Sequence, residues 1–231
     1  MDVRFRLRYT PSQKRVVDKS SVKSVKLHKP KQMHIVDLNG NVVNIDFLEK
    51  PEQDLVRQYI VGTDVVLELG ARYGSVSCAI NSKLDNKQNQ LVVEPDDRVW
   101  SALEINKTNN NCGFHIVKGF ISNKKLDLTN LDDYYGGYGA TYIETNDTKI
   151  PSYPLCDITN KYNLNFNVLV ADCEGYLEEF FNENPNFYDN LRLIIFEADY
   201  PDKCNYANIT TQLKKRNFKP LLEGHQNVWK L

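Results

Sequence analysis

Three apolar runs of this chain end at or next to acidic residues, and a glycine or a proline follows within one or two positions of these acids. These residues are Glu68, Gly70 and Gly74 for the first run, Glu94 and Pro95 for the second, and Asp172, Glu174 and Gly175 for the third. Open α/β sheets bind ligands at the carboxyl ends of their strands. A carboxylate there accepts hydrogen bonds from both hydroxyls of a ribose. The pattern therefore predicts a nucleoside-type cofactor between two adjacent strand ends.

The glycine turn after the first run narrows the choice of cofactor. Its sequence is Gly70-Ala71-Arg72-Tyr73-Gly74. A dinucleotide-binding turn has a further glycine in its middle, which lets the pyrophosphate approach the backbone. Because that glycine is absent, a cofactor without a pyrophosphate fits better, and S-adenosylmethionine is the candidate. The expected cofactor-binding residues are Glu68, Gly70, Ala71, Arg72, Tyr73, Gly74, Ser75, Glu94, Pro95, Gly119, Phe120 and Asp172.

Four predicted strands end in acids that would face one edge of the sheet. They are Glu68, Glu94, Asp172 and Glu197. Clustered carboxylates are costly unless they bind a cation, share protons or pair with basic groups. The positively charged sulfur of S-adenosylmethionine is such a cation. For any single acid, the alternative role is to cap the start of a helix.

The same acids supply the candidates for catalysis. We expect Asp172 to be the general base or to orient the acceptor hydroxyl, with Glu174 in support, because burial among carboxylates raises the pKa of an aspartate. His225, just past the last turn, is the alternative base. A divalent cation held by Asp172, Glu197 and Asp199 is a further alternative.

A long segment, residues 119–150, joins two predicted strands without an obvious helix. Its centre, residues 134–142, mixes tyrosines with glycines. Aromatic rings can stack on a sugar or on a base, and glycines let a loop close over a site. We expect Tyr135, Tyr138 and Glu197 to contact the substrate. The alternative is a β-hairpin whose tyrosines pack against the body of the protein.

Short apolar runs alternate with helical segments in the rest of the chain. The predicted strands are 65–69, 90–94, 114–118, 166–172, 191–198, 218–222 and 226–231, and the predicted helices are 51–60, 74–84, 96–109, 176–183 and 204–216. This order predicts an α/β fold with a mostly parallel, Rossmann-like methyltransferase sheet. A short turn at Gly224 predicts an antiparallel hairpin at the C-terminal end of the sheet.

The N-terminal part differs from the rest in charge. Its first 31 residues hold ten lysines and arginines against Asp2 and Asp18, although the whole chain has a net charge of −1. Residues 3–9 alternate as a strand does, and Asn39-Gly40 predicts a tight hairpin turn. We therefore divide the chain into a basic, β-rich extension (1–50) and a methyltransferase domain (51–231). The basic arm suits nucleic acid, an anionic substrate, a partner protein or a second copy, and also a plain solvated face.

Three motifs resemble those of the FkbM-type methyltransferases. Residues 68–74 resemble acid-x-Gly-Ala-Asn-x-Gly, with Arg72 in place of the usual Asn, and Glu94-Pro95 resembles the second motif. Asp172-Cys173-Glu174-Gly175 matches the most specific motif, Asp-x-Glu-Gly. The resemblance covers roughly residues 60–231 and extends to small stand-alone members encoded by large DNA viruses. It implies O-methylation that depends on S-adenosylmethionine, often of a sugar hydroxyl.

The leading hypothesis is an O-methyltransferase that acts on a carbohydrate, such as a deoxysugar of a glycan or of a sugar nucleotide. The alternatives are an RNA methyltransferase that uses the basic arm, and a non-catalytic nucleoside-binding protein. Five scattered cysteines without a CxxC pair argue against a disulfide framework or a zinc site and favour a reducing, cytoplasmic setting, the host cytoplasm if the protein is viral. No apolar run approaches the roughly 18 residues of a membrane span, so we expect no membrane contact. The sequence leaves open whether the protein forms a homo-oligomer.

Overall fold

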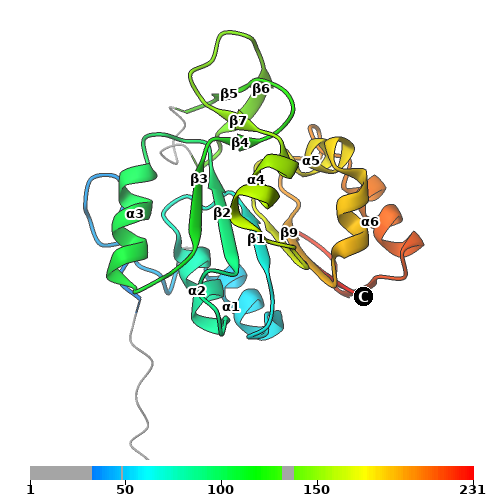
Figure 1. Ribbon diagram of the computed structural model, residues 1–231, viewed down its shortest axis with the longest axis horizontal. Coiled ribbons are helices and arrows are strands. Elements are labelled where there is room, and N and C mark those ends of the chain that lie inside the picture. The colour runs from blue at the N-terminus through cyan, green and yellow to red at the C-terminus, as the bar shows by residue number, and fades with distance from the viewer. Residues whose placement is uncertain (1–32, 48, 132–137) are drawn as a thin grey trace, which may run out of the picture. The chain divides into compact units, whose positions relative to one another are not determined.

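Among the described residues (33–47, 49–131 and 138–231), seven strands form the central sheet of this computed structural model, in the order β10-β11-β9-β8-β1-β2-β3 (Figure 1). They are β1 (Val66–Leu69), β2 (Gln90–Glu94), β3 (His115–Lys118), β8 (Val168–Ala171), β9 (Leu193–Glu197), β10 (Lys219–Leu222) and β11 (Gln226–Lys230). The strands from β3 to β9 are parallel, whereas β11 runs antiparallel to β9 and to β10. The predicted fold, a mostly parallel sheet with an antiparallel C-terminal hairpin, is confirmed.

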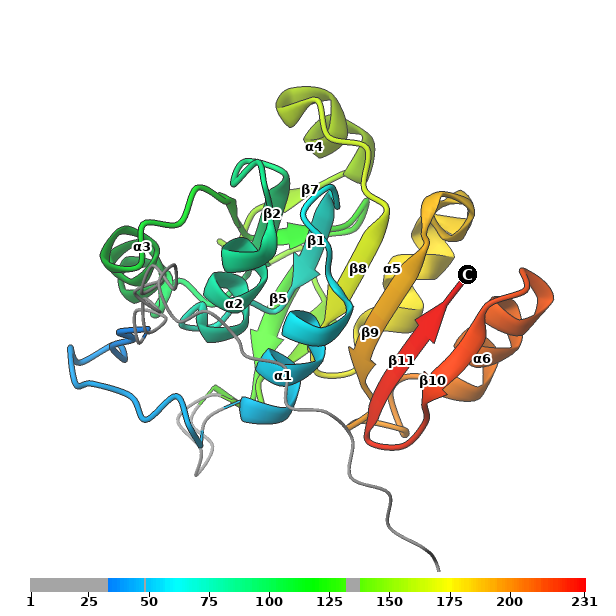
Figure 2. The same ribbon diagram turned by 90° about the horizontal axis from the view of Figure 1, so that it is seen from below.

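Helices cover both faces of the sheet, because successive side chains of a strand point to opposite sides. They are α1 (Lys50–Tyr59), α2 (Ser75–Lys83), α3 (Trp100–Asn109), α4 (Leu155–Tyr162), α5 (Leu177–Glu183) and α6 (Tyr206–Lys215). Val66 and Val168 pack with residues of α1 and α2 on one face, and Leu67 and Leu169 pack with residues of α4, α5 and α6 on the other. Figure 2 shows α1 and α2 in front of the sheet and α5 and α6 behind it. Burial on both faces explains why the inner strands are almost entirely apolar in sequence.

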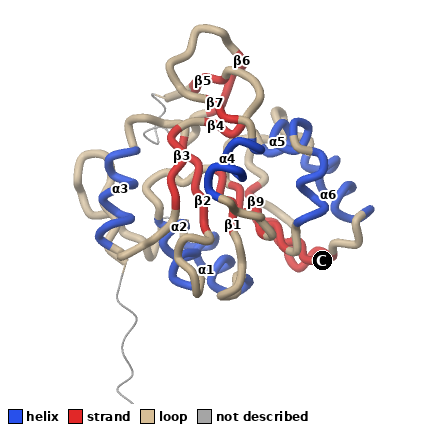
Figure 3. The backbone as a smooth tube through the Cα atoms, viewed as in Figure 1, coloured by secondary structure: helices blue, strands red, loops and turns tan. Residues whose placement is uncertain are grey.

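The long segment 119–150 forms short strands beyond the sheet (Figure 3). The pair β4 (Phe120–Ile121) and β7 (Ser152–Tyr153) is parallel, and the pair β5 (Leu126–Thr129) and β6 (Thr141–Glu144) is an antiparallel hairpin. Tyr138 and Tyr142 pack against buried side chains of the body, as the hairpin alternative predicts, and a contact of Tyr138 with the substrate stays a prediction. Tyr135 lies outside the described residues.

Residues 33–47 belong to the same unit as the sheet, which spans 33–231. Ile35 is fully buried, and the Asn106 side chain of α3 both accepts a hydrogen bond from Val36 N and donates one to Val36 O, each at 2.8 Å. The predicted Asn39-Gly40 turn is present with Gly40 at φ 81°, but the flanking strands reduce to one bridge between Val36 and Val42. The unit therefore begins before residue 51. The basic arm and the strand predicted at 3–9 lie outside the described residues.

Two helical elements were missed and one begins later than predicted. The helix α4 and the 3-10 helix η1 (Pro185–Asn190) are short, at eight and six residues, and α4 fully buries only Ile158. The helix α3 begins at Trp100 rather than at residue 96, because Asp96 and Val99 close a turn through the Val99 N–H and the Asp96 carbonyl (3.2 Å). No described helix has the length and apolar character that a bilayer crossing requires.

Candidate functional site

The carboxyl ends of β1 and β8 touch at Gly70. Its φ is +86°, and a Cβ on this residue would lie 1.7 Å from the carbonyl oxygen of Asp172. The Asp172 N–H donates to the Leu69 carbonyl at 3.0 Å. A side chain at position 70 would therefore push the two strand ends apart. The glycine turn and Asp172 are held together, as the sequence predicts.

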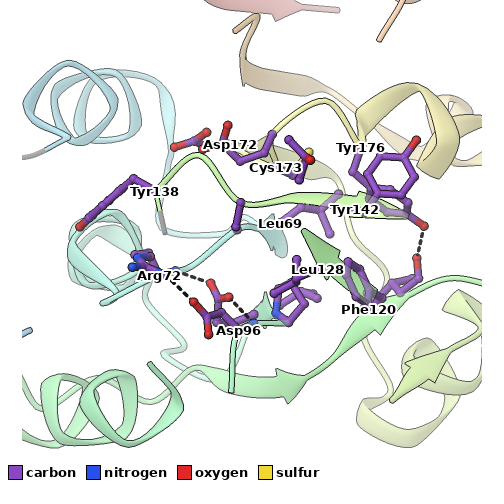
Figure 4. A pocket seen from close by; sticks show the side chains of 18 of the residues that line it. Leu69, Arg72, Asp96, Phe120, Leu128, Tyr138, Tyr142, Asp172, Cys173 and Tyr176 are labelled. Carbon is purple, nitrogen blue, oxygen red and sulfur yellow. Dashed lines mark hydrogen bonds and ion pairs between the residues drawn. The ribbon is translucent and has the colours of Figure 1, made fainter. Parts of the chain in front are cut away.

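A pocket lies over these strand ends, with an empty volume of about 750 Å³ that includes the part open to solvent (Figure 4). Its lining includes Glu49, Gly70, Arg72, Glu94, Pro95, Asp96, Phe120, Ile121, Leu128, Tyr138, Tyr142, Asp172, Cys173, Glu174 and Tyr176. Figure 4 shows Arg72 and Tyr138 on one side of it and Phe120, Tyr142 and Tyr176 on the other.

Glu94 lies at the end of β2 and is 5% exposed. Its two carboxylate oxygens accept hydrogen bonds from the backbone N–H groups of Arg72 (2.6 Å) and Asp96 (2.8 Å). Burial raises the pKa of Glu94 to about 7 against the effect of these two donors. An ionised carboxylate offers about four lone-pair sites, so Glu94 retains acceptor capacity toward a ligand in the pocket.

Arg72 and Arg98 share one carboxylate, that of Asp96. The distances are 2.7 Å from Arg72 Nη1 and 2.8 Å from Arg98 Nη2, both to Asp96 Oδ2. The Arg72 guanidinium also lies 4.7 Å from the centre of the Tyr138 ring, and Arg98 Nη1 donates to the Leu131 carbonyl at 2.9 Å. The two arginines thus contact Leu131 and Tyr138, which both belong to the segment between β5 and β6.

Aromatic rings form the opposite wall. The Tyr142 and Tyr176 rings meet edge to face with centroids 4.9 Å apart, and those of Phe120 and Tyr176 are 6.1 Å apart. The Tyr176 hydroxyl donates to the Ile121 carbonyl at 2.8 Å, which fixes its ring. This wall is mostly apolar and suits a flat ring system.

The acidic part of the pocket is centred on Asp172. Burial, followed by the charges of Glu197 and Glu49, raises the pKa of Asp172 well above its ordinary value. Burial also raises the pKa of Glu174 to about 10 and that of the Cys173 thiol, so this thiol is not a ready nucleophile.

The carboxylate of Asp172 and two neighbouring carboxylates come close enough to share one ion. Oxygens of Asp172, Glu174 and Asp199 all lie within 4.8 Å of one another. The predicted set for a divalent cation contained Glu197 in place of Glu174. Glu174 takes the place of Glu197 in this set because the backbone turns tightly between β8 and α5, where Glu174 has φ 51°.

Glu68 does not line this pocket. It points to the face under α2, where it accepts hydrogen bonds from Ser77 Oγ (2.8 Å) and Gln90 Nε2 (3.0 Å). Burial raises its pKa to about 8. The cause is strand alternation, because Glu68 precedes the last residue of β1 and its side chain lies on the α1 and α2 face. The four predicted acids therefore do not share one rim.

Glu197 and His225 lie together and do not line the main pocket, although Glu197 shares a second, smaller cavity with Asp172. His225 Nδ1 is 2.9 Å from Glu197 Oε1, and the His225 side chain is 63% exposed. Glu197 lines a second, smaller cavity with Glu68, and His225 lines neither cavity. The structure thus brings the alternative base to Glu197 but not to Asp172.

The remaining predicted residues mostly support the site from beneath. Ala71 and Tyr73 are buried, Gly74 packs close to Leu103, and Ser75 Oγ donates to Glu49. The Gly119 N–H donates to the Glu94 carbonyl at 3.0 Å, and a Cβ on Gly119 would lie 2.2 Å from the Pro151 carbonyl oxygen.

Several lining residues were missed from the sequence. They are Glu49, Glu52, Asp96, Leu128, Tyr142 and Tyr176. Glu49 has φ 49° as the residue before α1, and burial raises its pKa to about 7. A signal was present in part, because Glu49 precedes the helix-starting Pro51 and Asp96 follows Glu94 by two residues.

Comparison with known proteins gives distant likenesses only. No family model matches the chain, and no curated protein matches it. The chain is similar to the solved structure of a precorrin-6y C5,15-methyltransferase from Geobacter metallireducens GS-15, with 12% identity, a TM-score of 0.48, and coverage of 77% of this chain and 84% of that one. It is also similar to the structure of a putative O-methyltransferase from Klebsiella pneumoniae, with 10% identity, a TM-score of 0.48, and coverage of 80% of this chain and 81% of that one.

A third similar structure is a ribosomal protein L11 methylase from Lactobacillus delbrueckii subsp. bulgaricus, with 17% identity, a TM-score of 0.45, and coverage of 78% of this chain and 76% of that one. Likenesses this distant assign neither a family nor a substrate. The predicted FkbM resemblance and viral similarity therefore stay predictions.

Proposed function

We propose that this protein is a methyltransferase that uses S-adenosylmethionine. One observation carries the proposal: a single pocket is lined by Phe120 and Ile121 after β3, by Glu94 at the end of β2, and by Asp172 beside Gly70, in the strand order β3-β2-β1-β8. A nucleoside with a positively charged substituent matches these three parts in order.

The residues present fit this cofactor. The base would lie against Phe120 and Ile121, the ribose hydroxyls would reach Glu94, and the positive charge would lie toward Asp172. When bound, S-adenosylmethionine supplies a methyl group on a positively charged sulfur. The spare acceptor capacity of Glu94 and the raised pKa of Asp172 are both features that such a ligand would use.

Asp172 is the group placed to handle the proton of the acceptor. In the free protein, burial and the charges of Glu197 and Glu49 raise the pKa of this carboxyl well above its ordinary value, which favours its protonated form. A positive charge placed beside a carboxyl lowers its pKa and favours the carboxylate. The carboxylate can then accept a proton from an acceptor hydroxyl, so the base is formed where and when the charged ligand is present.

The acceptor that we favour is a sugar hydroxyl, so the reaction is O-methylation. Tyr138 and Tyr142 line the pocket, and aromatic faces pack well against the C–H faces of a sugar. The FkbM-like Asp172-Cys173-Glu174-Gly175 motif supports the same class. The described residues add no specific support for an RNA acceptor.

The first test is binding of S-adenosylhomocysteine, measured by calorimetry and by thermal shift. We expect saturable binding that weakens when Glu94 is changed to Ala. Absence of binding to the wild type would overturn the proposal.

The second test uses labelled S-adenosylmethionine with a panel of monosaccharides and sugar nucleotides. We expect Asp172→Asn to reduce methyl transfer by about 10²–10⁴-fold, the usual contribution of a general base, while S-adenosylhomocysteine still binds. The control is Asp189→Asn, an exposed residue whose partner is Arg216. Full activity of Asp172→Asn would rule out Asp172 as the base.

A further inference from the structure

A second cavity lies between the first turn of α1 and the carboxyl ends of β1, β8 and β9, with an empty volume of about 360 Å³ that includes the part open to solvent. Five carboxylates line it: Glu49, Glu52, Glu68, Asp172 and Glu197. Among the described residues, no lysine or arginine does so. It joins the main pocket along Glu49, Leu69, Gly70 and Asp172, which line both. We call it the acidic cavity.

Glu52 is the residue of the acidic cavity whose hydrogen bonding is incomplete. It is 9% exposed, and its Oε1 accepts a hydrogen bond from Gln226 Nε2. Its Oε2 is buried and receives no hydrogen bond from an N–H group or a hydroxyl of the described residues, and the Glu52 carboxyl contacts the Glu197 carboxyl, which raises the pKa of Glu197. Gln226 Oε1, in the same lining, is also buried and lacks a donor there. Two buried acceptors without donors are costly, so the cavity calls for a group that supplies N–H or O–H donors.

The charges around Glu52 call for a donor that is also a cation. Burial, and then the charge of Glu52, raise the pKa of Glu197 to about 7, and burial raises the pKa of Glu49 to about 7. His225 contacts Glu197 from outside, where it is 63% exposed, and it does not line the cavity. Within the lining, the negative groups therefore lack a positive partner.

We propose that the acidic cavity binds a protonated primary amine, held by Glu52 Oε2 and Gln226 Oε1. An ammonium group has three N–H donors and one positive charge, which matches both needs. A metal ion fits less well, because the carboxylates whose oxygens lie within 4.8 Å of one another are Asp172, Glu174 and Asp199, and Glu52 is not among them. The inference rests on the proposed function. It leaves two sources of the amine, the amino-acid end of the cofactor and an amine on the acceptor.

The first experiment compares S-adenosylhomocysteine with 5′-methylthioadenosine, which lacks the amino-acid end, on the wild type and on Glu52→Gln by calorimetry. If the cofactor supplies the amine, the variant weakens S-adenosylhomocysteine at least about 10-fold and leaves methylthioadenosine unchanged. A tenfold change equals about 1.4 kcal/mol. The substitution keeps the size of the side chain, and its new amide N–H can donate to Gln226 Oε1. The free variant should therefore melt at or above the wild-type temperature.

The second experiment tests the acceptor as the source, with glucosamine and glucose added to protein saturated with S-adenosylhomocysteine. If the acceptor supplies the amine, glucosamine binds more tightly than glucose and loses this advantage in Glu52→Gln. The matched control is Asp54→Asn on the exposed side of the same helix, which should change neither comparison.

The amine proposal fails if Glu52→Gln alters neither S-adenosylhomocysteine nor glucosamine binding. It also fails if the wild type binds S-adenosylhomocysteine no better than methylthioadenosine and also binds glucosamine no better than glucose. This outcome is measured on the wild type alone and does not depend on whether a variant folds. Failure of the proposed function looks different, because then neither nucleoside binds the wild type.

Discussion

The two ends of the ligand-binding region differ in how their charges are balanced. At the Arg72 end, Asp96 pairs with two arginines and Glu94 accepts two backbone N–H groups. At the Glu52 end, five carboxylates line one cavity without a lysine or arginine among its described lining residues. Gly70 lies between the two ends and lines both cavities.

This difference in charge balance suggests different roles for the two ends, one in holding the local structure and one in binding a ligand. A buried charge that already has its partners fixes local geometry without a ligand. A group of buried acids without a cation keeps its protons or destabilises the fold, and it gains most when a positive ligand arrives. The Asp96 pairs at the Arg72 end are therefore expected to contribute mainly to stability, whereas Glu94 beside them and the acids of the Glu52 end are expected to contribute to binding.

The largest effect on stability should come from breaking the paired end. Asp96→Ala removes the carboxylate that Arg72 and Arg98 share and leaves Arg72, 8% exposed, without this partner. We expect a loss of about 3 kcal/mol in the free energy of unfolding, the usual cost of leaving a buried charge uncompensated. Urea unfolding measures it.

The control for Asp96→Ala is Asp54→Ala, whose carboxylate forms exposed pairs with Lys50 and Arg57 on α1. Exposed pairs contribute about 0–1 kcal/mol, so this variant should unfold close to the wild type. Equal losses in the two variants would show that the buried arrangement at Asp96 is not the source of stability.

The next effect is the pH dependence of the free protein. The pKa values of Glu49, Glu94 and Glu197 are raised from 4.5 to about 7, and that of Glu68 to about 8. Between pH 4.5 and 8 the folded protein therefore holds more protons than the unfolded chain. The stability from these groups is fully present below pH 4.5 and is lost as the pH rises through 7 to 8.

Thermal unfolding between pH 5 and 8.5 checks this prediction. We expect the free energy of unfolding to fall by an amount on the order of 1–3 kcal/mol across the range. Sinefungin, which carries an amine in place of the sulfonium, should flatten the decline because its positive charges favour the carboxylates. Stability that increases with pH over this range would contradict the assignment of these groups.

The sequence predicted the sheet well because its signal is local. Runs such as Val168–Ala171 are apolar on both faces, and they predict buried parallel strands without knowledge of their neighbours. The contact between Gly70 and Asp172 was also within reach, since both follow such strands. By contrast, α4 is only eight residues long, so the helical spacing of Leu155, Ile158 and Tyr162 covers too short a stretch to stand out in the sequence.

The site was predicted less completely because side-chain direction depends on register and on distant partners. Glu68 was assigned to the rim with Glu94, but the alternation of β1 turns it under α2. Glu52 contributes to the acidic cavity only because α1 packs beside β9 and β11. Its hydrogen-bond partner Gln226 is 174 positions away in the sequence. No short motif encodes that contact.

The smallest predicted effect concerns the aromatic side of the paired end. The Arg72 guanidinium lies 4.7 Å from the Tyr138 ring centre, and the ring's contribution is expected to be about 0.5–1 kcal/mol. Tyr138→Phe keeps the ring and should retain most of this energy, whereas Tyr138→Leu should lose it. Urea unfolding is measured for both variants, and again with Arg72→Met added to each. The part of the stability difference between Phe and Leu at position 138 that disappears with Arg72→Met is the interaction energy between the guanidinium and the ring. If Phe and Leu at position 138 cost the same in the Arg72 background, the Tyr138 ring serves only as apolar packing and does not stabilise the guanidinium of Arg72.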